Sequence, residues 1–144
     1  MSGNKGRITG FTCGAFDLLH AGHILMLHEA AKHCTHLIVS LQSDPSIDRP
    51  HKNKPIQSLR ERKIQLLGCK FVDRVVVYTT EADLEKLLIS LRPDVRIIGM
   101  DWKGRPYTGH ALPIKVHYNT RNHHYSTTEL RERIHNEQGR DRSS

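Results

Sequence analysis

Long apolar runs, paired cysteines and aromatic residues are all scarce in this sequence. No apolar run approaches the roughly 20 residues that a membrane-spanning helix needs. The polar residues 1–7 lack the apolar core of a secretion signal. The three cysteines, Cys13, Cys34 and Cys69, are odd in number and form no C-x-x-C pair, which argues against a disulfide framework and a zinc ribbon. We therefore expect a cytoplasmic protein with reduced thiols and no membrane association.

Basic residues exceed acidic ones, and the formal net charge is +7. Such a surplus suits either nucleic acid or small polyanions such as nucleotides and phosphorylated metabolites. The basic residues gather in segments 49–54, 60–63 and 131–142, without interleaved aromatic residues on which bases could stack. Small phosphorylated ligands are therefore favoured, and nucleic acid is disfavoured.

The pattern of apolar residues alternates strands and helices over a chain of 144 residues, which is enough for one domain with a core. Residues 1–138 are expected to form that domain, and residues 139–144 a disordered charged tail. Alternating short strands and helices predict a parallel sheet covered on both faces. Strands are expected at 8–13, 36–42, 72–78, 95–99 and 113–118, and helices at 22–34, 59–67, 80–91 and 126–136.

Ligands of such sheets bind beyond the carboxyl ends of the strands. The unusual polar segments of this chain all follow strands, so they should lie on that one rim. These segments are residues 14–23, 43–57, 99–101 and 121–128.

The most informative segment is residues 14–23, G-A-F-D-L-L-H-A-G-H, which follows the first expected strand. Gly14 lets the backbone approach a ligand, and His20 and His23 stand three residues apart at the start of a helix. A strand, a glycine turn and a helix N-terminus form an anion site, because N–H groups and the helix dipole point at one spot. Imidazoles there can donate N–H groups to phosphate oxygens that gain charge during displacement. The simpler alternative is a pair of surface or capping histidines.

A metal site is a competing hypothesis for His20 and His23, because histidines three apart can share an ion. A third ligand at suitable spacing is not evident nearby. His33, Cys34 and His36 straddle an expected helix end, so their side chains are expected to diverge. The sequence therefore assigns no metal-binding residue.

Arg121 and the run Ser126-Thr127-Thr128 form a second polar cluster. Ser126 and Glu129 fit an S-x-x-E capping box at the start of the last helix. Capping alone does not explain three consecutive hydroxyl groups after an arginine. A helix N-terminus with extra hydroxyl donors suits the outer phosphates of a triphosphate.

The segment 43–57 is polar, basic and long, as functional or mobile loops often are. A solvated basic face is the default interpretation of its lysines. The alternative is a lid whose lysines close on phosphates. Lys54 is the favoured candidate and Lys52 the next, and Arg62 could reach the same site from the following helix.

Other residues on this rim have less specific signals. Asp17 is expected to cap the following helix or to orient backbone N–H groups, in preference to acting as a general base. Phe16 is expected to pack rather than to stack on a base. Asp101 and Trp102 could line the base or acceptor pocket, or simply cover the core edge, and Gly99 allows close backbone approach.

Together these segments resemble the cytidylyltransferase-like nucleotidyltransferases that carry an H-x-G-H motif, and most of all the glycerol-3-phosphate cytidylyltransferases. The resemblance spans residues 8 to 134 approximately. It implies a Rossmann-like three-layer α/β sandwich with a five-stranded parallel sheet, a homodimer, and Mg²⁺ held mainly through nucleotide phosphates. It also implies transfer of CMP from CTP to a phosphorylated small alcohol such as glycerol 3-phosphate, with release of pyrophosphate.

The motifs and the resemblance together give each site residue an expected role. The acceptor phosphate is already an anion, so catalysis needs positioning and charge neutralisation rather than a general base. The expected catalytic residues are His20, His23, Lys54 and Arg121; the nucleotide-binding residues are Thr12, Cys13, Gly14, Ala15, Phe16, Gly22, Lys52, Arg62, Gly99, Asp101, Ser126, Thr127 and Thr128; the acceptor-binding residues are Asp17 and Trp102.

The chain departs from the family pattern where Met100 stands between Gly99 and Asp101, and where Asn-His-His-Tyr separates Arg121 from Ser126. These departures affect the choice of nucleotide and acceptor more than the chemistry. Relatives with the same motif use ATP, in ADP-heptose synthesis, FAD synthesis and pantetheine-phosphate adenylylation. An ATP-dependent adenylyltransferase is therefore the alternative enzyme, and a non-catalytic nucleotide- or RNA-binding module is the alternative from another class.

Overall fold

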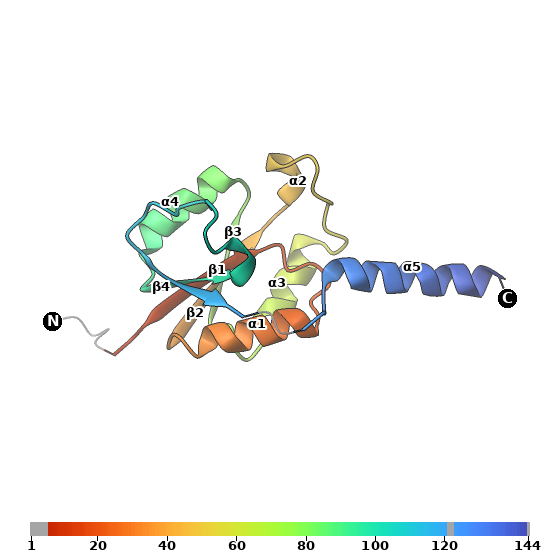
Figure 1. Cartoon of the computed structure of the whole chain (residues 1–144), viewed down its shortest axis with the longest axis horizontal. Coiled ribbons are helices and arrows are strands. Elements are labelled where there is room, and N and C mark those ends of the chain that lie inside the picture. The colour runs from red at the N-terminus through yellow and green to blue at the C-terminus, as the bar shows by residue number, and fades with distance from the viewer. Residues whose placement is uncertain (1–5, 121–122, 144) are drawn as a thin grey trace.

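A computed structural model describes residues 6–120 and 123–143, with side chains described as far as Gln138. Within these residues, five parallel strands form one sheet in the order β3-β2-β1-β4-β5. Figure 1 shows α1, α3 and α4 packed around this sheet, and the strand order confirms the predicted five-stranded parallel topology. The strands are β1 (Thr9–Gly14), β2 (His36–Gln42), β3 (Arg74–Tyr78), β4 (Val95–Gly99) and β5 (Lys115–Asn119).

The helices begin where the sequence places capping residues. Ser58 and Glu61 form the predicted capping box of α3: the Ser58 hydroxyl accepts the Glu61 N–H at 3.1 Å, and the Glu61 carboxylate accepts the Ser58 N–H at 2.9 Å. Across residues 6–120 and 123–143, no helix combines the length and apolar character needed to cross a membrane. The helices are α1 (Ala21–Ala31), α2 (Pro45–Asp48), α3 (Leu59–Leu67), α4 (Glu81–Leu91) and α5 (Thr127–Ser143), and a 3-10 turn, η1, spans Met100–Trp102.

Alternate residues of β2 face opposite sides of the sheet, as the pleat requires. Leu37, Val39 and Leu41 join a buried apolar cluster with residues of α1 and α3. Ile38 joins another apolar cluster on the other face of the sheet, with Leu84 and other residues of α4. Helices therefore cover both faces, which confirms the three-layer, Rossmann-like α/β sandwich.

The segment 43–57, predicted as one loop, contains the short helix α2. Asp44 caps this helix by accepting the Ser46 N–H at 2.9 Å, and Pro45 occupies its first position. The helix is only four residues long, so it leaves no periodic apolar pattern in the sequence. The Asp-Pro pair is the local signal that could have revealed it.

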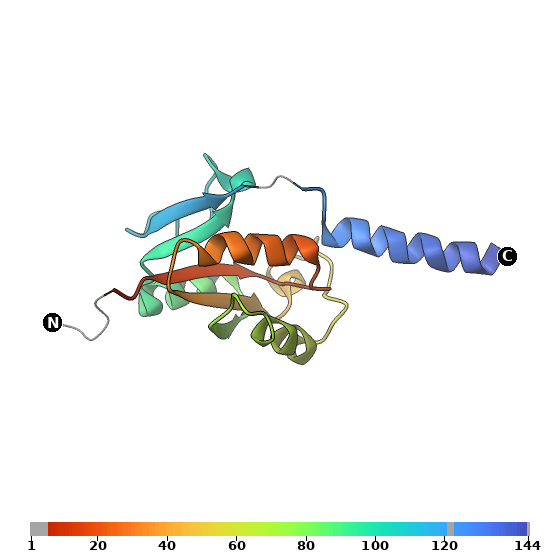
Figure 2. The same cartoon turned by 90° about the horizontal axis from the view of Figure 1, so that it is seen from below.

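The last helix, α5, continues beyond the predicted end at residue 136 and runs to Ser143. The predicted disordered tail is therefore helical as far as Ser143. The helix also crosses residue 138, where the domain was predicted to end. Residues 137–143 contain no proline, and Gly139 costs a helix only about 1 kcal/mol relative to alanine. Figures 1 and 2 both show α5 running away from the body of the molecule.

Candidate active site

The H-x-G-H turn, which leads from β1 into α1, supplies the histidines that cap the N-terminus of α1. His20 is the N-cap residue of α1, and its Nδ1 accepts the Gly22 N–H at 3.0 Å. His23 Nδ1 accepts the His20 N–H at 3.2 Å, which completes a capping box. Because a backbone N–H can only donate, each neutral imidazole carries its proton on Nε2. The H-x-G-H turn thus presets both Nε2–H groups as donors.

The two rings stack on each other, with their centroids 3.9 Å apart. Burial is the main cause that lowers the pKa of His23 to about 4; repulsion from His20, when that ring is protonated, acts in the same direction, and Asp17 opposes the shift. His23 is therefore neutral near pH 7, and it acts as a hydrogen-bond donor rather than as a cation.

Position 22 requires glycine, because the rings around it leave no room for a side chain. A Cβ atom at Gly22 would lie 2.8 Å from Cε1 of His20 and 2.9 Å from Cε1 of His123. This close approach also places His123 beside the H-x-G-H turn. Gly14 has a milder constraint, because a Cβ there would lie 3.3 Å from the Phe16 ring.

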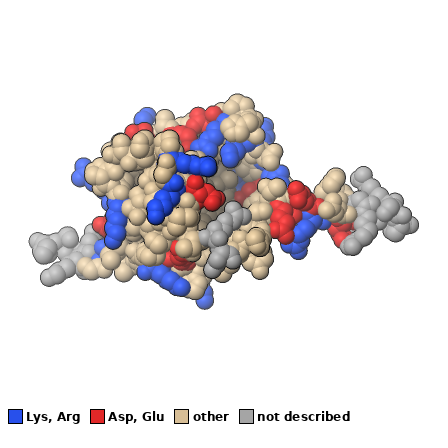
Figure 3. Space-filling view, in the orientation of Figure 1, with Lys and Arg blue, Asp and Glu red and all other residues tan. Residues whose placement is uncertain are grey.

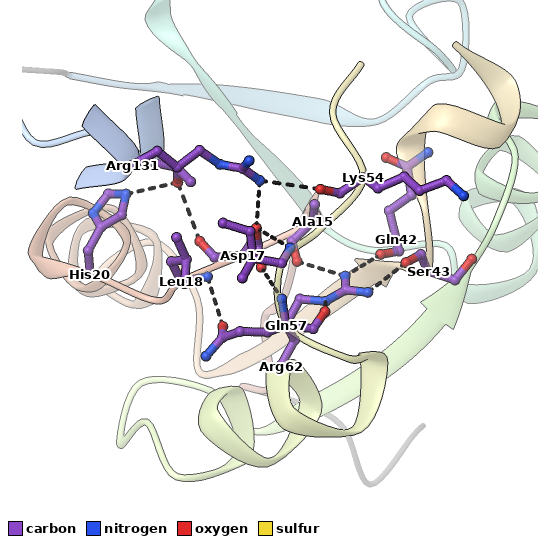
Figure 4. A network of polar contacts seen from close by, with 12 residues as sticks. Ala15, Asp17, Leu18, His20, Gln42, Ser43, Lys54, Gln57, Arg62 and Arg131 are labelled. Carbon is purple, nitrogen blue, oxygen red and sulfur yellow. Dashed lines mark hydrogen bonds and ion pairs between the residues drawn. The ribbon is translucent and has the colours of Figure 1, made fainter. Parts of the chain in front are cut away.

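The run Ser126-Thr127-Thr128, the hydroxyl cluster at the start of α5, contacts the H-x-G-H turn (the histidine turn) directly. His20 Nε2 and Thr127 Oγ1 are 3.2 Å apart, although the residues are 107 positions apart in the sequence. Since the His20 Nε2 carries the proton, it donates to the hydroxyl, which in turn donates to the Asp17 carbonyl at 3.4 Å. Ser126 caps α5 by accepting the Glu129 N–H at 3.0 Å, as predicted. Figure 4 shows His20 from α1 reaching across to this contact.

A cavity of about 290 Å³, the histidine pocket, lies where these groups meet among the described residues. It adjoins a larger cleft of about 1070 Å³ at the same rim, and Met26, Gly99 and Asn119 line both. Of the predicted site residues, the larger cleft is lined by Thr12, Cys13, Gly14, Gly99 and Trp102. The histidine pocket is lined by His20, Gly22, His23, Met26, Gly99, Met100, Asp101, Asn119, Thr120, His123, Tyr125, Ser126 and Thr127.

Asp17 is buried and holds the basic loop against the motif turn (Figure 4). Its carboxylate accepts the Ile56 N–H at 2.8 Å and the Gln57 N–H at 2.9 Å. Arg131 of α5 donates to the same carboxylate at 3.0 Å and to the Lys54 carbonyl at 3.3 Å. Asp17 therefore orients backbone N–H groups, as its local sequence context suggested. It does not line either cavity, which differs from its expected contact with the acceptor.

Arg62 lies in the protein interior and supports the fold, and it is not placed to bind phosphate. Its side chain is buried, and the guanidinium donates to backbone carbonyls (Figure 4). These contacts tie α3 to the motif turn and to the end of β2, so the guanidinium is not directed at the pocket. The carbonyl oxygens are those of Ala15 at 3.0 Å, Gln42 at 2.7 Å, Ser43 at 2.6 Å and Gln57 at 3.2 Å.

Phe16 and Ala15 line neither cavity, which differs from their expected contact with the nucleotide. The Phe16 ring is 5% exposed and belongs to the apolar cluster under α1 and α3, so it packs in the core. Its φ of 49° and the φ of 52° at Leu18 lie in the left-handed region, which costs bulky residues energy. The turn that presents the histidines is therefore strained and is held by its surroundings.

The two predicted loop lysines stand apart from the pocket. Lys52 and Lys54 are exposed, and neither lines the histidine pocket or the larger cleft. Thr128 is exposed on the first turn of α5. Arg121 lies outside the described residues. Basic and acidic side chains are interspersed on the face shown in Figure 3.

Sequence reasoning left Arg131, His123 and Asn119 out of the predicted site. The sequence marks Arg131 only as part of the basic segment 131–142, and nothing in its local sequence points to Asp17. His123 lies between Arg121 and Ser126, and this position in the sequence could have marked it as a site residue. Asn119 ends β5 beside Gly99 of β4 in the strand register, so only the strand pairing brings it to the rim.

Comparison with known proteins agrees with this geometry. The model of the cytidylyltransferase-like family matches residues 11–133, which include the histidine turn and the hydroxyl cluster. The fold and the site together define an α/β domain of the nucleotidyltransferase type. The chain belongs to the cytidylyltransferase-like family.

Relatives at about 40% identity are bacterial proteins of greater length. The bifunctional protein HldE of Wolinella succinogenes is 40% identical over 114 residues, which cover 78% of this chain and 24% of the relative. HldE of Helicobacter pylori is 38% identical over 125 residues, which cover 86% of this chain and 27% of the relative. The chain thus spans about a quarter of the length of these relatives.

Solved structures share the fold. The lipopolysaccharide core biosynthesis protein of Thermoplasma volcanium is 28% identical, with a TM-score of 0.65, and the match covers 84% of this chain and all of that one. Pantothenate synthetase of Thermus thermophilus is 14% identical, with a TM-score of 0.59, and the match covers 87% of this chain and 64% of that one. The second likeness is one of fold alone.

Proposed function

We propose that this chain transfers a nucleoside monophosphate from a nucleoside triphosphate to a phosphorylated small molecule and releases pyrophosphate. The observation that carries this proposal is the hydrogen bond between His20 and Thr127, which joins the H-x-G-H turn to the hydroxyl cluster in one pocket. Imidazole N–H groups, hydroxyl groups and two helix N-termini there suit a triphosphate.

The proposed reaction needs no general base, because the acceptor phosphate is already an anion. An oxygen of that phosphate attacks the α-phosphorus and forms a new P–O bond. The bond to the bridging oxygen breaks, and pyrophosphate leaves with the electron pair. The Nε2–H of His23, and that of His20 after it exchanges the Thr127 hydroxyl for a phosphate oxygen, would donate to the oxygens on which charge grows.

The exposed lysines would complete the site by loop closure. The Ile56 and Gln57 N–H groups are fixed by Asp17, so the anchored end of the loop lies beside the motif turn. Lys52 and Lys54 precede this anchor and are exposed. We propose that triphosphate binding draws their ammonium groups in, and that Arg121 neutralises the same phosphates.

Magnesium fits the donor groups of this pocket. The ion is usually held by substrate phosphates and one or two carboxylates, and it keeps several waters. Asp101 offers an exposed carboxylate on the wall of the histidine pocket. We propose that the nucleotide phosphates and Asp101 hold Mg²⁺, which would neutralise phosphate charge when bound.

The proposal has two candidate pairs of substrates. The first is CTP with a phosphorylated alcohol such as glycerol 3-phosphate, and it rests on the motif resemblance. The second is ATP with a phosphorylated sugar. It is supported by the likeness to HldE proteins and to a lipopolysaccharide core biosynthesis protein, since that core is built from sugars.

The test is pyrophosphate release with Mg²⁺, CTP or ATP, and a panel of phosphorylated alcohols and sugars. Release with CTP and glycerol 3-phosphate supports the first pair, and release with ATP and a sugar phosphate supports the second. The matched control is His20→Asn, which keeps a capping acceptor but lacks the Nε2–H donor. Equal release by this variant would contradict the proposed site.

A binding module without turnover predicts a different result. It would release no pyrophosphate with any pair, and it would bind oligonucleotides with an affinity that falls steeply as salt rises. That combination would overturn the proposal of catalysis.

A further inference from the structure

A cluster of metal-ligating side chains lies at the end of α1 opposite the histidine pocket. Glu29 lies in the last turn of α1, and His33 lies in the turn just after the end of this helix. His117 of β5 reaches the same place. One ligand atom from each of these residues lies within 4.8 Å of the other two.

The carboxylate of Glu29 is already oriented in this cluster. His117 Nε2 lies 2.9 Å from Glu29 Oε2, and the His33 and His117 rings stack with centroids 3.6 Å apart. Thr120 donates its N–H to Oε2 at 3.1 Å and its hydroxyl to Oε1 at 2.8 Å. Such outer contacts are what fix metal-binding carboxylates in known sites.

The charge of the cluster suits a cation. Partial burial raises the pKa of Glu29, but hydrogen bonds from His117 and Thr120 outweigh burial and hold the pKa below its usual range. Glu29 is therefore ionised at neutral pH, with imidazole nitrogens beside it. Two imidazoles and one carboxylate are a ligand set of three-ligand zinc sites, in which water takes the fourth position.

The spacing needs only small side-chain movements to receive an ion. Ligand atoms around a tetrahedral zinc ion lie about 3.4 Å apart, since each bond is about 2.0–2.2 Å long. The atoms of this cluster are within 4.8 Å of one another. The His33 and His117 rings are stacked, and His33 is exposed, so its ring can turn out of the stack and direct a nitrogen at the ion.

We infer that Glu29, His33 and His117 bind one zinc ion, at a site separate from the phosphates and their Mg²⁺. Zinc would take the place of the proton between His117 Nε2 and Glu29 Oε2, and a neutral His117 ring would then carry its proton on Nδ1. The ion would join α1, whose N-terminus carries the histidine turn, to β5. Thr120, which holds Glu29, also lines the histidine pocket, so the zinc site would steady one wall of that pocket.

The experiment is a titration of the full, metal-free chain with Zn²⁺ by calorimetry, in the absence of nucleotide. We expect one Zn²⁺ per chain, read from the molar ratio at which the titration reaches its midpoint. Co²⁺ in place of Zn²⁺ should give the visible absorption of a tetrahedral site. Failure of the wild-type chain to bind Zn²⁺ in this stoichiometry would overturn the inference.

Variants assign the site to these residues. His33→Ala and His117→Ala should weaken Zn²⁺ binding by at least about tenfold, and exposed His33 can be truncated without loss of the fold. The matched control is His28→Ala, because His28 lies next to Glu29 on α1 but stacks on Phe71. Zn²⁺ binding that survives His33→Ala, or that His28→Ala weakens equally, would contradict the site.

Discussion

At the scale of single residues, the histidines of the motif do two tasks with two different nitrogens. Nδ1 of His20 and of His23 accepts a backbone N–H and caps α1. Nε2 is thereby left as the protonated nitrogen that can donate to a ligand. Substitutions can separate these tasks, because other residues supply a capping acceptor without an imidazole N–H.

His20→Asn should keep the fold and lose turnover. Asparagine is a good N-cap residue, whereas His20→Ala removes the cap and costs about 0.5–2 kcal/mol of stability. Loss of one donor to a charged transition state lowers kcat by roughly 10²–10³-fold. Thermal unfolding and steady-state kinetics of the two variants check this prediction. Wild-type kcat in His20→Asn would show that capping is the whole role of His20.

His23 should make the folded state less stable in mild acid. Its pKa is about 4 in the folded protein and about 6.5 in an unfolded chain. The unfolded state therefore binds more protons between these values, so the contribution is fully present above pH 6.5 and is lost as the pH falls toward 4. The loss is up to about 3 kcal/mol.

Urea unfolding across that pH range measures this contribution. His23→Gln keeps a capping acceptor at the third helical position and cannot titrate, so its stability should fall less between pH 6.5 and 4. The same pH dependence in wild type and variant would assign the acid sensitivity to another group.

At the scale of elements, buried polar side chains hold the motif turn between its neighbours. Asp17 fixes the loop that enters α3, and Arg62 of α3 returns to the carbonyls of the turn and of β2. A turn with left-handed φ at Phe16 and Leu18 needs such outside support.

Arg62→Met should therefore destabilise the protein by about 3 kcal/mol or more, because it leaves buried carbonyls without donors. Arg60→Met is the matched control, since Arg60 is exposed on the same helix; its effect should stay within about 0.5 kcal/mol. Urea unfolding of both variants measures the difference. Similar stabilities would show that the Arg62 contacts contribute little.

At the scale of the whole molecule, the first turns of α5 join the site, as far as the side chains up to Gln138 show. Thr127 contacts His20, and Arg131 contacts Asp17, whereas the rest of the helix runs away from the body (Figures 1 and 2). A chain that ends at Gln138 should therefore keep wild-type turnover and melting temperature. A chain that ends at Ser126 should lose turnover, because Thr127 and Arg131 are gone. Loss of activity on removing 139–144 would give the end of α5 a role in the site.

Much of the fold could be predicted from local sequence. The bounds of β2, α3 and β4 agree with the predicted ones, because periodic apolar residues and a capping box mark them. The end of α5 could not be predicted in this way, since its last turns have no apolar periodicity and Gly139, a usual stop signal, lies inside the helix.

The sequence by itself determined the parallel sheet and the H-x-G-H turn, because apolar periodicity, capping residues and glycine act over a few neighbouring positions. It also identified the hydroxyl cluster at the start of α5. Only the tertiary structure decided that His20 meets Thr127, that Arg62 is buried among carbonyls, and that Glu29 and His117 are in contact. These contacts join residues distant in the chain, and their geometry is set by strand order and helix packing rather than by any local pattern.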